Sequence, residues 1–374
     1  MADTMIDKIN AVGRRATWFE LFFDLVFVAG VARLAGLLAA DFTPLGFARF
    51  AFLFLVLWWC WVAHTFYATR FDRDEPTQRL LGLATIATIV FVAFAAPQAF
   101  ETQGVIFGLA VAAFKALLGL SYAVAAAQNE KGRPVARIYV AIQAVGAVIW
   151  GVSGLIDNEP LRISLWFLGL AVDVASPFIV TRFTHALPPH PEHLPERFGL
   201  FTIILFGESV AALVHGVDHL PTIGMIDVAT VCLAMMLPFL FWWGYFDTVR
   251  GVAERHVHSR EDARRLQIWA YAHIPLFLGT AVIAVGGRLV VEHVVFSLAQ
   301  SLLFSAAAGI AMAALTLIAA SHAGPTQSRV IFFAVAAITA VSGLAGIVIG
   351  SLGLLVVLVA LAALQTGIGI LRSR

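Results

Sequence analysis

Long uninterrupted stretches of apolar residues constrain the fold of this 374-residue chain more than any other feature. A helix needs about 20 apolar residues to cross roughly 30 Å of hydrocarbon. Twelve stretches approach that length, near residues 17–40, 45–67, 80–99, 103–127, 138–156, 161–184, 198–217, 225–247, 266–287, 294–320, 329–349 and 352–371. The sequence therefore predicts an all-α, polytopic membrane helix bundle of about twelve transmembrane helices, with the lipid bilayer as its solvent.

Composition agrees with this prediction and excludes other classes of protein. Hydrophobic residues make up 60% of the chain and charged residues 13%, whereas soluble domains are about half apolar and a quarter charged. A net charge of +1 provides no field that would attract nucleic acid, so we expect no nucleic-acid partner. The sequence contains no phosphate-binding glycine loop, nucleophile elbow or HExxH motif. We therefore expect no enzymatic activity and no cofactor.

The distribution of Lys and Arg predicts the orientation in the membrane, because cytoplasmic loops retain positive charge. With the N-terminus inside, most of the 24 Lys and Arg residues lie on the cytoplasmic side, and Arg49, Arg162 and Arg288 are the exceptions that face outward. The first sixteen residues are polar and lack the apolar core of a signal peptide, so the first helix is expected to remain as an anchor. Both termini are predicted to be cytoplasmic.

A comparison of the chain with itself indicates an internal repeat. A shift of 184 residues aligns Asp24 with Glu208 and lays residues 58–59, a Trp pair, on the Trp pair at 242–243. Because each copy would hold an even number of helices, the copies would be parallel repeats related by an axis along the membrane normal. The predicted halves are residues 1–187 and 188–374, joined by a proline-rich linker at about 185–197.

Ionisable residues inside the predicted spans are the main candidates for function. Each charge at the bilayer centre costs about 2.5 to 3.5 kcal/mol, so these groups must pair, face water or be protonated. Lys115 is the expected counter-ion of Asp24, Asp173 or Glu208. The candidate substrate-binding and proton-binding residues are Glu20, Asp24, Lys115, Asp173, Glu208 and His215.

The spacing of these residues allows two interpretations. Glu20 and Asp24 share one face of the first helix, and Glu208 and His215 share a face of the seventh. They could form a ladder that carries protons through the membrane, or they could be neutralised pairs that only lock helices together. We favour the functional interpretation, since ionisable groups within membranes are rare and are usually retained for function.

Three further features carry weaker predictions. The sequence H-x4-H-x2-H at His185, His190 and His193 lacks Cys or acidic ligands at the spacing of known sites, so we expect no metal there. Ser176 and Pro177 are predicted to break a helix beside a cavity. An aromatic belt or ordinary packing is favoured over a substrate platform for five residues, Trp58, Trp59, Trp61, Trp242 and Trp243.

Two long motifs resemble a known family. Residues 18–28 (WFELFFDLVFV) and 193–209 (HLPERFGLFTIILFGES) are similar to the two signatures of the bacterial low temperature requirement A (LtrA) family, and the likeness extends over essentially the whole chain. Phe206 stands where a smaller aliphatic residue is expected. The resemblance implies a multi-pass protein of the bacterial inner membrane, named for a growth phenotype. The charged residues that match motif positions are Glu20, Asp24, Glu196, Arg197 and Glu208.

The leading functional hypothesis is a proton-coupled secondary transporter that moves protons and an unidentified small solute. Its site would lie between the two halves and would be formed by Asp24, Glu208, Lys115 and Asp173. One alternative is a proton or ion channel that uses the same acids. Another is a non-transporting membrane protein with a structural or sensory role, or an enzyme acting on lipids, linked to low-temperature growth. A homodimer is compatible with the sequence.

Overall fold

The computed structural model describes residues 17–71, 76–184, 188–322 and 328–373, and within these ranges all regular structure is helical. The elements are α2 (Trp18–Ala40), α3 (Pro44–Phe71), α4 (Pro76–Ala95), η1 (Ala96–Gln98), α5 (Gly104–Gln128), α6 (Arg133–Ser153), α7 (Glu159–Thr184), α8 (His193–Asp218), α9 (Met225–Trp243), η2 (Gly244–Thr248), α10 (Arg260–Val291), α11 (Leu298–Ala320), α12 (Ser328–Val341), η3 (Ser342–Ala345) and α13 (Gly346–Ser373). The predicted all-α polytopic bundle is confirmed.

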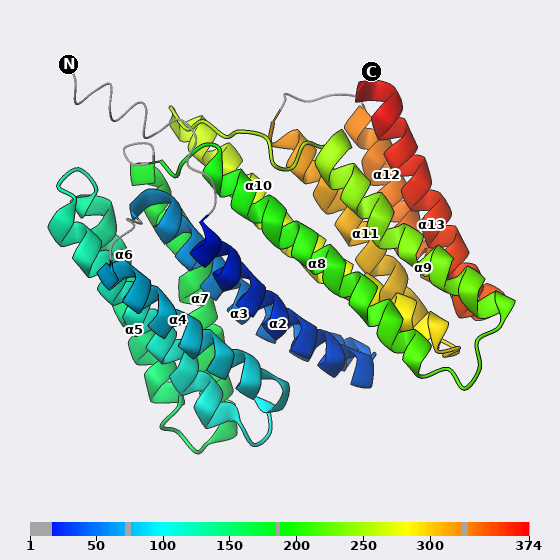
Figure 1. The fold of residues 1–374 in the computed structure, drawn as a ribbon, viewed down its shortest axis with the longest axis horizontal. Coiled ribbons are helices and arrows are strands. Elements are labelled where there is room, and N and C mark those ends of the chain that lie inside the picture. Colours follow the sequence, from blue (N-terminus) through cyan, green and yellow to red (C-terminus); the bar gives the residue numbers. More distant parts are fainter. Residues whose placement is uncertain (1–16, 72–75, 185–187, 323–327, 374) are drawn as a thin grey trace.

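Eleven helices in the described ranges are long and apolar enough to cross a membrane, and the last of them accounts for two crossings. That segment, Arg329–Arg372, has 44 residues, and a straight helix of this length would extend about 66 Å, twice the hydrocarbon thickness. Gly350 interrupts it with a φ of 73°, a left-handed conformation that favours glycine. Helices α12 and α13 then pack against each other (Figure 1). The chain therefore makes about twelve crossings.

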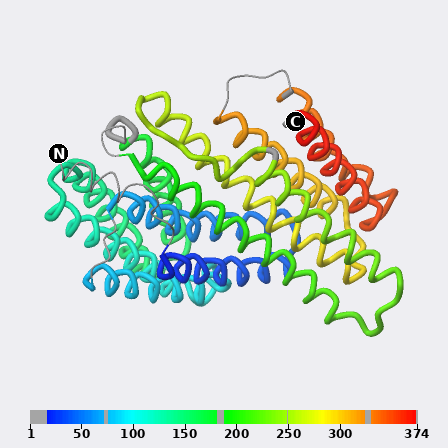
Figure 2. The backbone as a smooth tube through the Cα atoms, turned by 45° about the horizontal axis from the view of Figure 1, so that its top comes forward, coloured from blue at the N-terminus to red at the C-terminus, as the bar shows by residue number. Residues whose placement is uncertain are grey.

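The helices are arranged as two lobes that meet along four central helices (Figure 1). Helices α4 to α7 form one side of the molecule, and α9 together with α11 to α13 forms the other. Between them, α2 and α3 contact α8 and α10. Both views place α2 alongside α8 (Figures 1 and 2). Contacts between the first and second halves of the sequence are therefore concentrated on these four helices and on α7, which also touches α10.

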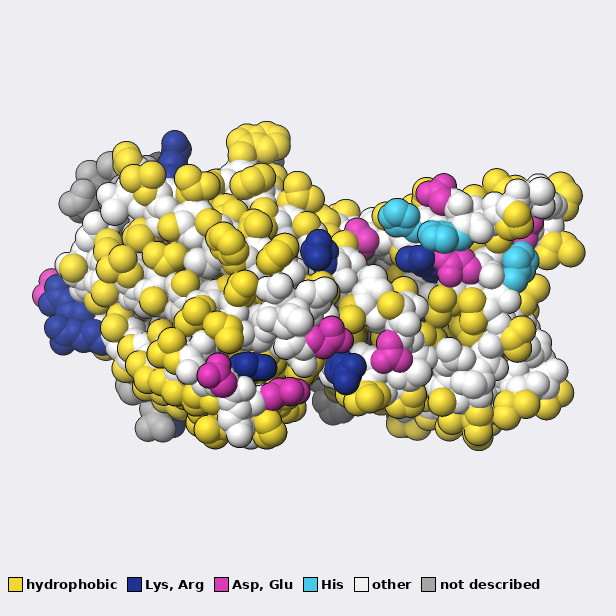
Figure 3. All heavy atoms as spheres, turned by 90° about the horizontal axis from the view of Figure 1, so that it is seen from below, with side chains coloured by type: hydrophobic (Ala, Val, Ile, Leu, Met, Phe, Trp, Pro, Cys, Tyr) yellow, Lys and Arg dark blue, Asp and Glu magenta, His cyan; other side chains and the backbone are white. Residues whose placement is uncertain are grey.

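The outer surface is largely apolar, as lipid contact requires. Seen from below, hydrophobic side chains cover most of both lobes, and charged and His side chains gather in patches between and upon them (Figure 3). At this end of α8, α9 and α10 the polar groups pair locally, with His293 2.7 Å from Asp227 and Arg288 2.8 Å from Glu292. Such pairing is expected where helices emerge into water.

Helix α8 begins at His193, earlier than the start near residue 198 that the sequence suggested. The prolines of the linker had indicated an irregular segment up to residue 197. Pro195 lies in the first helical turn, where its missing N–H has no intrahelical partner and costs nothing. As a result, His193 and Arg197 are helical and fully buried.

Helix α7 continues through Pro177 instead of breaking there. A proline leaves the carbonyl four residues earlier without its helical hydrogen bond, and this carbonyl belongs to Asp173. The Ser176 hydroxyl donates to it at 2.8 Å. The neighbouring carbonyl of Val174 accepts a bond of 2.6 Å from the hydroxyl of Tyr271 on α10. The predicted break is therefore replaced by two side-chain hydrogen bonds, one of which joins the two halves.

We predict that the end of the bundle carrying the α5–α6 turn is cytoplasmic. The N-terminus is predicted to be cytoplasmic, and the four crossings of α2 to α5 return the chain to the side on which α2 begins. In a Cys60→Ala, Cys232→Ala background, Glu130→Cys in the α5–α6 turn should resist a membrane-impermeant maleimide in intact cells. Asp157→Cys in the α6–α7 loop, a matched exposed acid at the opposite end, should be labelled. Labelling of Glu130→Cys alone would contradict this orientation.

Candidate functional site

Helix α2 starts with a capping arrangement that orients its first acid. The Thr17 hydroxyl accepts from the backbone N–H of Glu20 at 3.2 Å, and one oxygen of the Glu20 carboxylate accepts from the Thr17 N–H at 2.8 Å. This reciprocal bonding is the capping box, which satisfies N–H groups that a helix start leaves without partners. The second carboxylate oxygen of Glu20 is thereby held toward α8.

The next acid on the same face, Asp24, is paired with Arg197 of α8. The guanidinium Nε donates to Oδ2 of Asp24 at 3.1 Å and Nη2 donates to Oδ1 at 2.5 Å. The indole Nε1 of Trp61 on α3 donates to the same Oδ1 at 2.7 Å. All three side chains are fully buried. A bidentate guanidinium–carboxylate contact fixes direction as well as distance, so it sets how α2 lies against α8.

The same register brings a histidine to the first acid. His193 and Arg197 are four residues apart on α8, as Glu20 and Asp24 are on α2, and the two pairs meet in order. The ring Nε2 of His193 lies 3.0 Å from Oε1 of Glu20, and Arg197 Nη1 lies 3.5 Å from the same oxygen. Glu20, Asp24, Trp61, His193 and Arg197 together are called the α2–α8 cluster below.

The charges of the α2–α8 cluster leave room for one proton. Glu20 and Asp24 are two potential negative charges, Arg197 is one permanent positive charge, and His193 is charged only when protonated. A third acid, Glu196, lies 3.4 Å from Nδ1 of His193, but its side chain is partly exposed to water, so it is counted outside the buried cluster. With a neutral imidazole the cluster carries a net charge of −1, and with one added proton it is neutral. Burial of net charge is costly, and imidazole is the side chain whose charge changes most readily near neutral pH. The buried cluster therefore holds one more potential negative charge than permanent positive charge.

A small internal cavity adjoins the cluster. It has a volume of about 20 Å³ and is lined by Glu20, by His64 of α3 and by Ser121 of α5, among others. That space is large enough for about one water molecule, given polar groups to bind it. The Nδ1 of His64 is buried without a hydrogen-bond partner. A water at this position would join Glu20 to His64.

The structure pairs Lys115 with Asp173, one of the three partners expected from the sequence. The Lys115 Nζ lies 2.5 Å from Oδ1 of Asp173, and both side chains are buried. Gly146 of α6 lies over the lysine, where a Cβ would come within 3.5 Å of the Lys115 Cδ. This pair joins α5 to α7 inside the first half of the chain and is neutral as it stands.

Glu208 and His215 occupy a different environment from the other candidate residues. Glu208 is half-buried and His215 is exposed, and no hydrogen bond or ion pair of Glu208 occurs among the described residues. Glu208 lies eleven residues beyond Arg197 on α8, which is about 16 Å along the helix from the level of Asp24. The residues that aligned in the sequence, Asp24 and Glu208, are therefore not brought together in space.

A cavity lies between the halves, with a volume of about 70 Å³. Its walls are α3, α6 and α7 on one side and α10 on the other. Trp58, Trp59 and Tyr271 supply aromatic surface, and Ser176 and Pro177 lie in its wall, as the sequence suggested. Two of the lining residues, Trp58 and Gln143, carry buried polar atoms without partners, a donor (Nε1) and an acceptor (Oε1) respectively. Arg70 adds a cation to the residues that line this cavity. Polar groups among mostly aromatic and apolar lining residues are a common feature of small-molecule sites.

Of the two alternatives favoured from the sequence, a belt or ordinary packing, packing describes the tryptophans of α3. Trp58, Trp59 and Trp61 are buried, with exposed fractions of 2%, 3% and 0%. They pack inside the bundle because residues 56–62 of α3 lie between the lobes and are buried. Trp242 of α9 is exposed, as a belt position requires.

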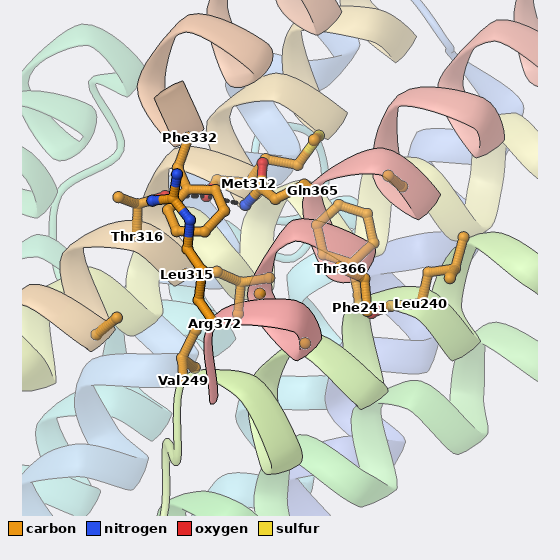
Figure 4. Close-up of a pocket in the computed structure, with 14 residues that line it drawn as sticks. Leu240, Phe241, Val249, Met312, Leu315, Thr316, Phe332, Gln365, Thr366 and Arg372 are labelled. Atoms are coloured by element: carbon orange, nitrogen blue, oxygen red, sulfur yellow. Dashed lines mark hydrogen bonds between the residues drawn. The ribbon is translucent and has the colours of Figure 1, made fainter. Parts of the chain in front are cut away.

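A further cavity of about 180 Å³ lies wholly within the second half, between α9, α11, α12 and α13. Figure 4 shows Arg372 extending beside Phe332 and Thr316 at one side of it, and Gln365 bonded to the carbonyl of Met312. The walls are otherwise mostly apolar. None of the acids predicted from the sequence lines this cavity.

No group of three or more potential metal ligands converges among the described residues. In the H-x4-H-x2-H sequence, His185 lies outside the described residues. His193 faces Glu20, and the Nδ1 of His190 lies 3.2 Å from the backbone N–H of His193. The two described histidines are therefore engaged in helix-end and cluster contacts.

Sequence reasoning missed the roles of Arg197 and Trp61. Arg197 was counted as a cytoplasmic loop charge because the prolines before it indicated a linker. A usable signal was present, since His193 and Arg197 repeat the four-residue spacing of Glu20 and Asp24. Trp61 carried no such signal, because an indole in an apolar run is equally consistent with packing.

Comparison with known proteins places the cluster within a shared region. The model of the family described as bacterial low temperature requirement A protein (LtrA) matches residues 15–365. An uncharacterized protein of Rhizobium meliloti (strain 1021) is 30% identical over 302 residues, which cover 76% of this chain and 72% of that protein. Every residue of the α2–α8 cluster lies inside the range matched by the family model.

We predict that Lys115 and Asp173 stabilise the fold only as a pair. Lys115→Met alone leaves an unpaired buried carboxylate, which should cost about 3–5 kcal/mol and lower the unfolding temperature measured in detergent. Adding Asp173→Leu, which has the same branched shape as Asp without its charge, should restore most of that loss. If the double variant were as unstable as the single one, the pair would contribute more than mutual neutralisation.

Proposed function

The chain belongs to the bacterial low temperature requirement A family, and on that premise we propose that it is a proton-coupled secondary transporter of the bacterial inner membrane. It is a multi-pass membrane protein built from apolar helices. The observation that carries the proposal is the α2–α8 cluster, in which two buried carboxylates share one permanent cation and one histidine. Ionisable groups at such depth mark proton relays and substrate paths in membrane proteins.

Protonation of His193 would change whether the cluster must be hydrated or can be enclosed. With His193 neutral, the net charge of −1 favours a hydrated arrangement, whereas the protonated, neutral cluster can be enclosed between α2 and α8. Because one half of the chain supplies Glu20 and Asp24 and the other supplies His193 and Arg197, the gain or loss of a proton acts on the contact between the halves. Rocking of one half against the other is the motion that alternating access requires.

The cavity between α3, α6, α7 and α10 is the proposed solute site. Its aromatic walls suit a small solute with an apolar body, and Trp58 Nε1 and Gln143 Oε1 would donate and accept one hydrogen bond each. Asp173, paired with Lys115, lies one helical turn from Ser176 in the cavity wall. Because α3, α6 and α7 come from one half and α10 from the other, movement of the halves would change the shape of this cavity. Glu208, which does not line this cavity, would be a second protonation site.

Solute-dependent proton uptake tests the proposal. Proteoliposomes that contain a pH-sensitive dye would be offered a panel of small neutral, cationic and anionic solutes with aromatic or aliphatic bodies. A transported solute should acidify the lumen with saturable kinetics, and preloaded solute should accelerate uptake by counterflow. Conductance without counterflow would indicate a channel, and no flux of solute or protons under any gradient would exclude transport.

We predict that His193→Gln separates exchange from proton coupling. Glutamine retains a hydrogen bond to Glu20 and cannot take up the proton, so solute counterflow should persist while proton-coupled uptake falls at least tenfold. Asp218→Asn, which removes an exposed acid at the far end of the same helix, is the matched control and should retain proton-coupled uptake. Equal proton uptake by His193→Gln and the unaltered protein would exclude the cluster as the coupling site.

A further inference from the structure

A second buried arginine, Arg255, lies outside both the cluster and the solute cavity. It belongs to the segment between η2 and α10, and its backbone N–H donates to the carbonyl of Pro191 at 2.9 Å. Its guanidinium carbon lies 4.6 Å from the centre of the Trp269 ring, and Nη1 donates to the hydroxyl of Ser321 at the end of α11 at 3.0 Å. The side chain is therefore held in one position by three parts of the fold.

The guanidinium has donors that nothing in the described chain accepts. Its Nε and Nη2 are buried without hydrogen-bond partners, and only 8% of the residue is exposed. Burial lowers the pKa of Arg255 to about 9, so the group is still positively charged at neutral pH. A buried donor without a partner destabilises the fold, and a charged donor does so more strongly. Nε and Nη2 together form the edge that grips an oxyanion with two parallel bonds.

Arg255 lines a cavity of about 110 Å³ whose acidic residues are already satisfied. Asp262 accepts hydrogen bonds from the hydroxyl and the N–H of Ser259, and Glu254 lies 3.0 Å from His256. Neither acid forms an ion pair with Arg255 among the described residues. The cation is therefore enclosed beside an open space without a counter-charge from the chain.

We propose that Arg255 forms a binding site for a phosphate group in the cavity between the start of α10 and the end of α11. The inference rests on two observations: Arg255 lines the cavity, and its buried Nε and Nη2 have no hydrogen-bond partner among the described residues. A phosphate offers several oxygens, so it can accept both guanidinium donors and still face the outer part of the cavity. Trp269 and Ser321 act as positioning residues that hold the guanidinium plane.

The location leaves two sources for that phosphate. The segment 249–259 joins the ends of membrane-spanning helices, which is the level at which phospholipid head groups lie. A soluble phosphate could enter the same cavity from water. Both sources present the same chemistry to Arg255, and they are distinguished by whether a lipid or a free ion stabilises the protein. The site is separate from the proposed transport pathway, so it stands whether or not the chain transports a solute.

Ligand-induced stabilisation of the purified full-length protein tests the site. Anything that binds the folded state alone raises the unfolding temperature in a concentration-dependent way. In one arm, inorganic phosphate is titrated in detergent against chloride at equal ionic strength. In the other, the protein is placed in nanodiscs of phosphatidylcholine with or without phosphatidylglycerol, and bound lipid is counted by native mass spectrometry. We expect saturable stabilisation by phosphate, or retention of phosphatidylglycerol.

Three variants relate the effect to Arg255. Arg255→Gln should lower the affinity for phosphate or phosphatidylglycerol, whichever of the two binds, at least tenfold. Arg255→Lys, which keeps the charge but loses the two-donor edge, should lower it nearly as much. Arg265→Gln is the matched control, because this arginine lines the same cavity but is exposed and already pairs with Glu261 at 3.2 Å. It should retain binding within a factor of about two. Absence of stabilisation and lipid retention in the unaltered protein, or equal loss in Arg265→Gln, would overturn the proposal.

Discussion

The contact between Asp24 and Arg197 is the interaction on which the arrangement of the two halves depends. Neither group can remain ionised alone inside a bilayer, and each comes from a different half of the chain. A bidentate pair accepts little change in angle, so it aligns α2 with α8. That alignment in turn brings His193 to Glu20. Trp61 reaches the shared carboxylate oxygen from α3, which packs against α2.

The Lys115–Asp173 pair and the α2–α8 cluster differ in charge balance. Lys115 and Asp173 cancel, and α5 and α7 that carry them belong to the same half. The α2–α8 cluster contains one more acid than permanent cations, and it spans the halves. A balanced pair is suited to holding helices together, whereas an unbalanced cluster has a protonation state that depends on its surroundings. This contrast is why the cluster, and not the lysine pair, is the centre of the proposed coupling.

Much of the fold could be predicted because hydropathy is a local property. The apolar runs located about twelve crossings, and even the last two, 329–349 and 352–371, correspond to α12 and α13 around the break at Gly350. The start of α8 could not be predicted in the same way. Proline usually marks a loop, and only the first-turn exception lets Pro195 sit inside the helix. That local exception moved Arg197 from an expected loop into the core.

The candidate site, too, could be predicted only in part from the sequence. Residue type and depth in the span were sufficient to single out Glu20, Asp24, Lys115 and Asp173 as buried charges that need partners. The choice of partner depends on which helices touch and in what register, and the sequence does not encode that locally. Lys115 could have paired with any of three acids, and the packing of α6 against both α5 and α7 places Asp173 within its reach. The sequence by itself determined that these charges lie within the membrane, since burial cost depends only on residue and environment. Only the tertiary structure decided that Asp24 pairs with Arg197 and that Glu208 lies away from both of them. Pairing requires helices from distant parts of the chain to pack in register.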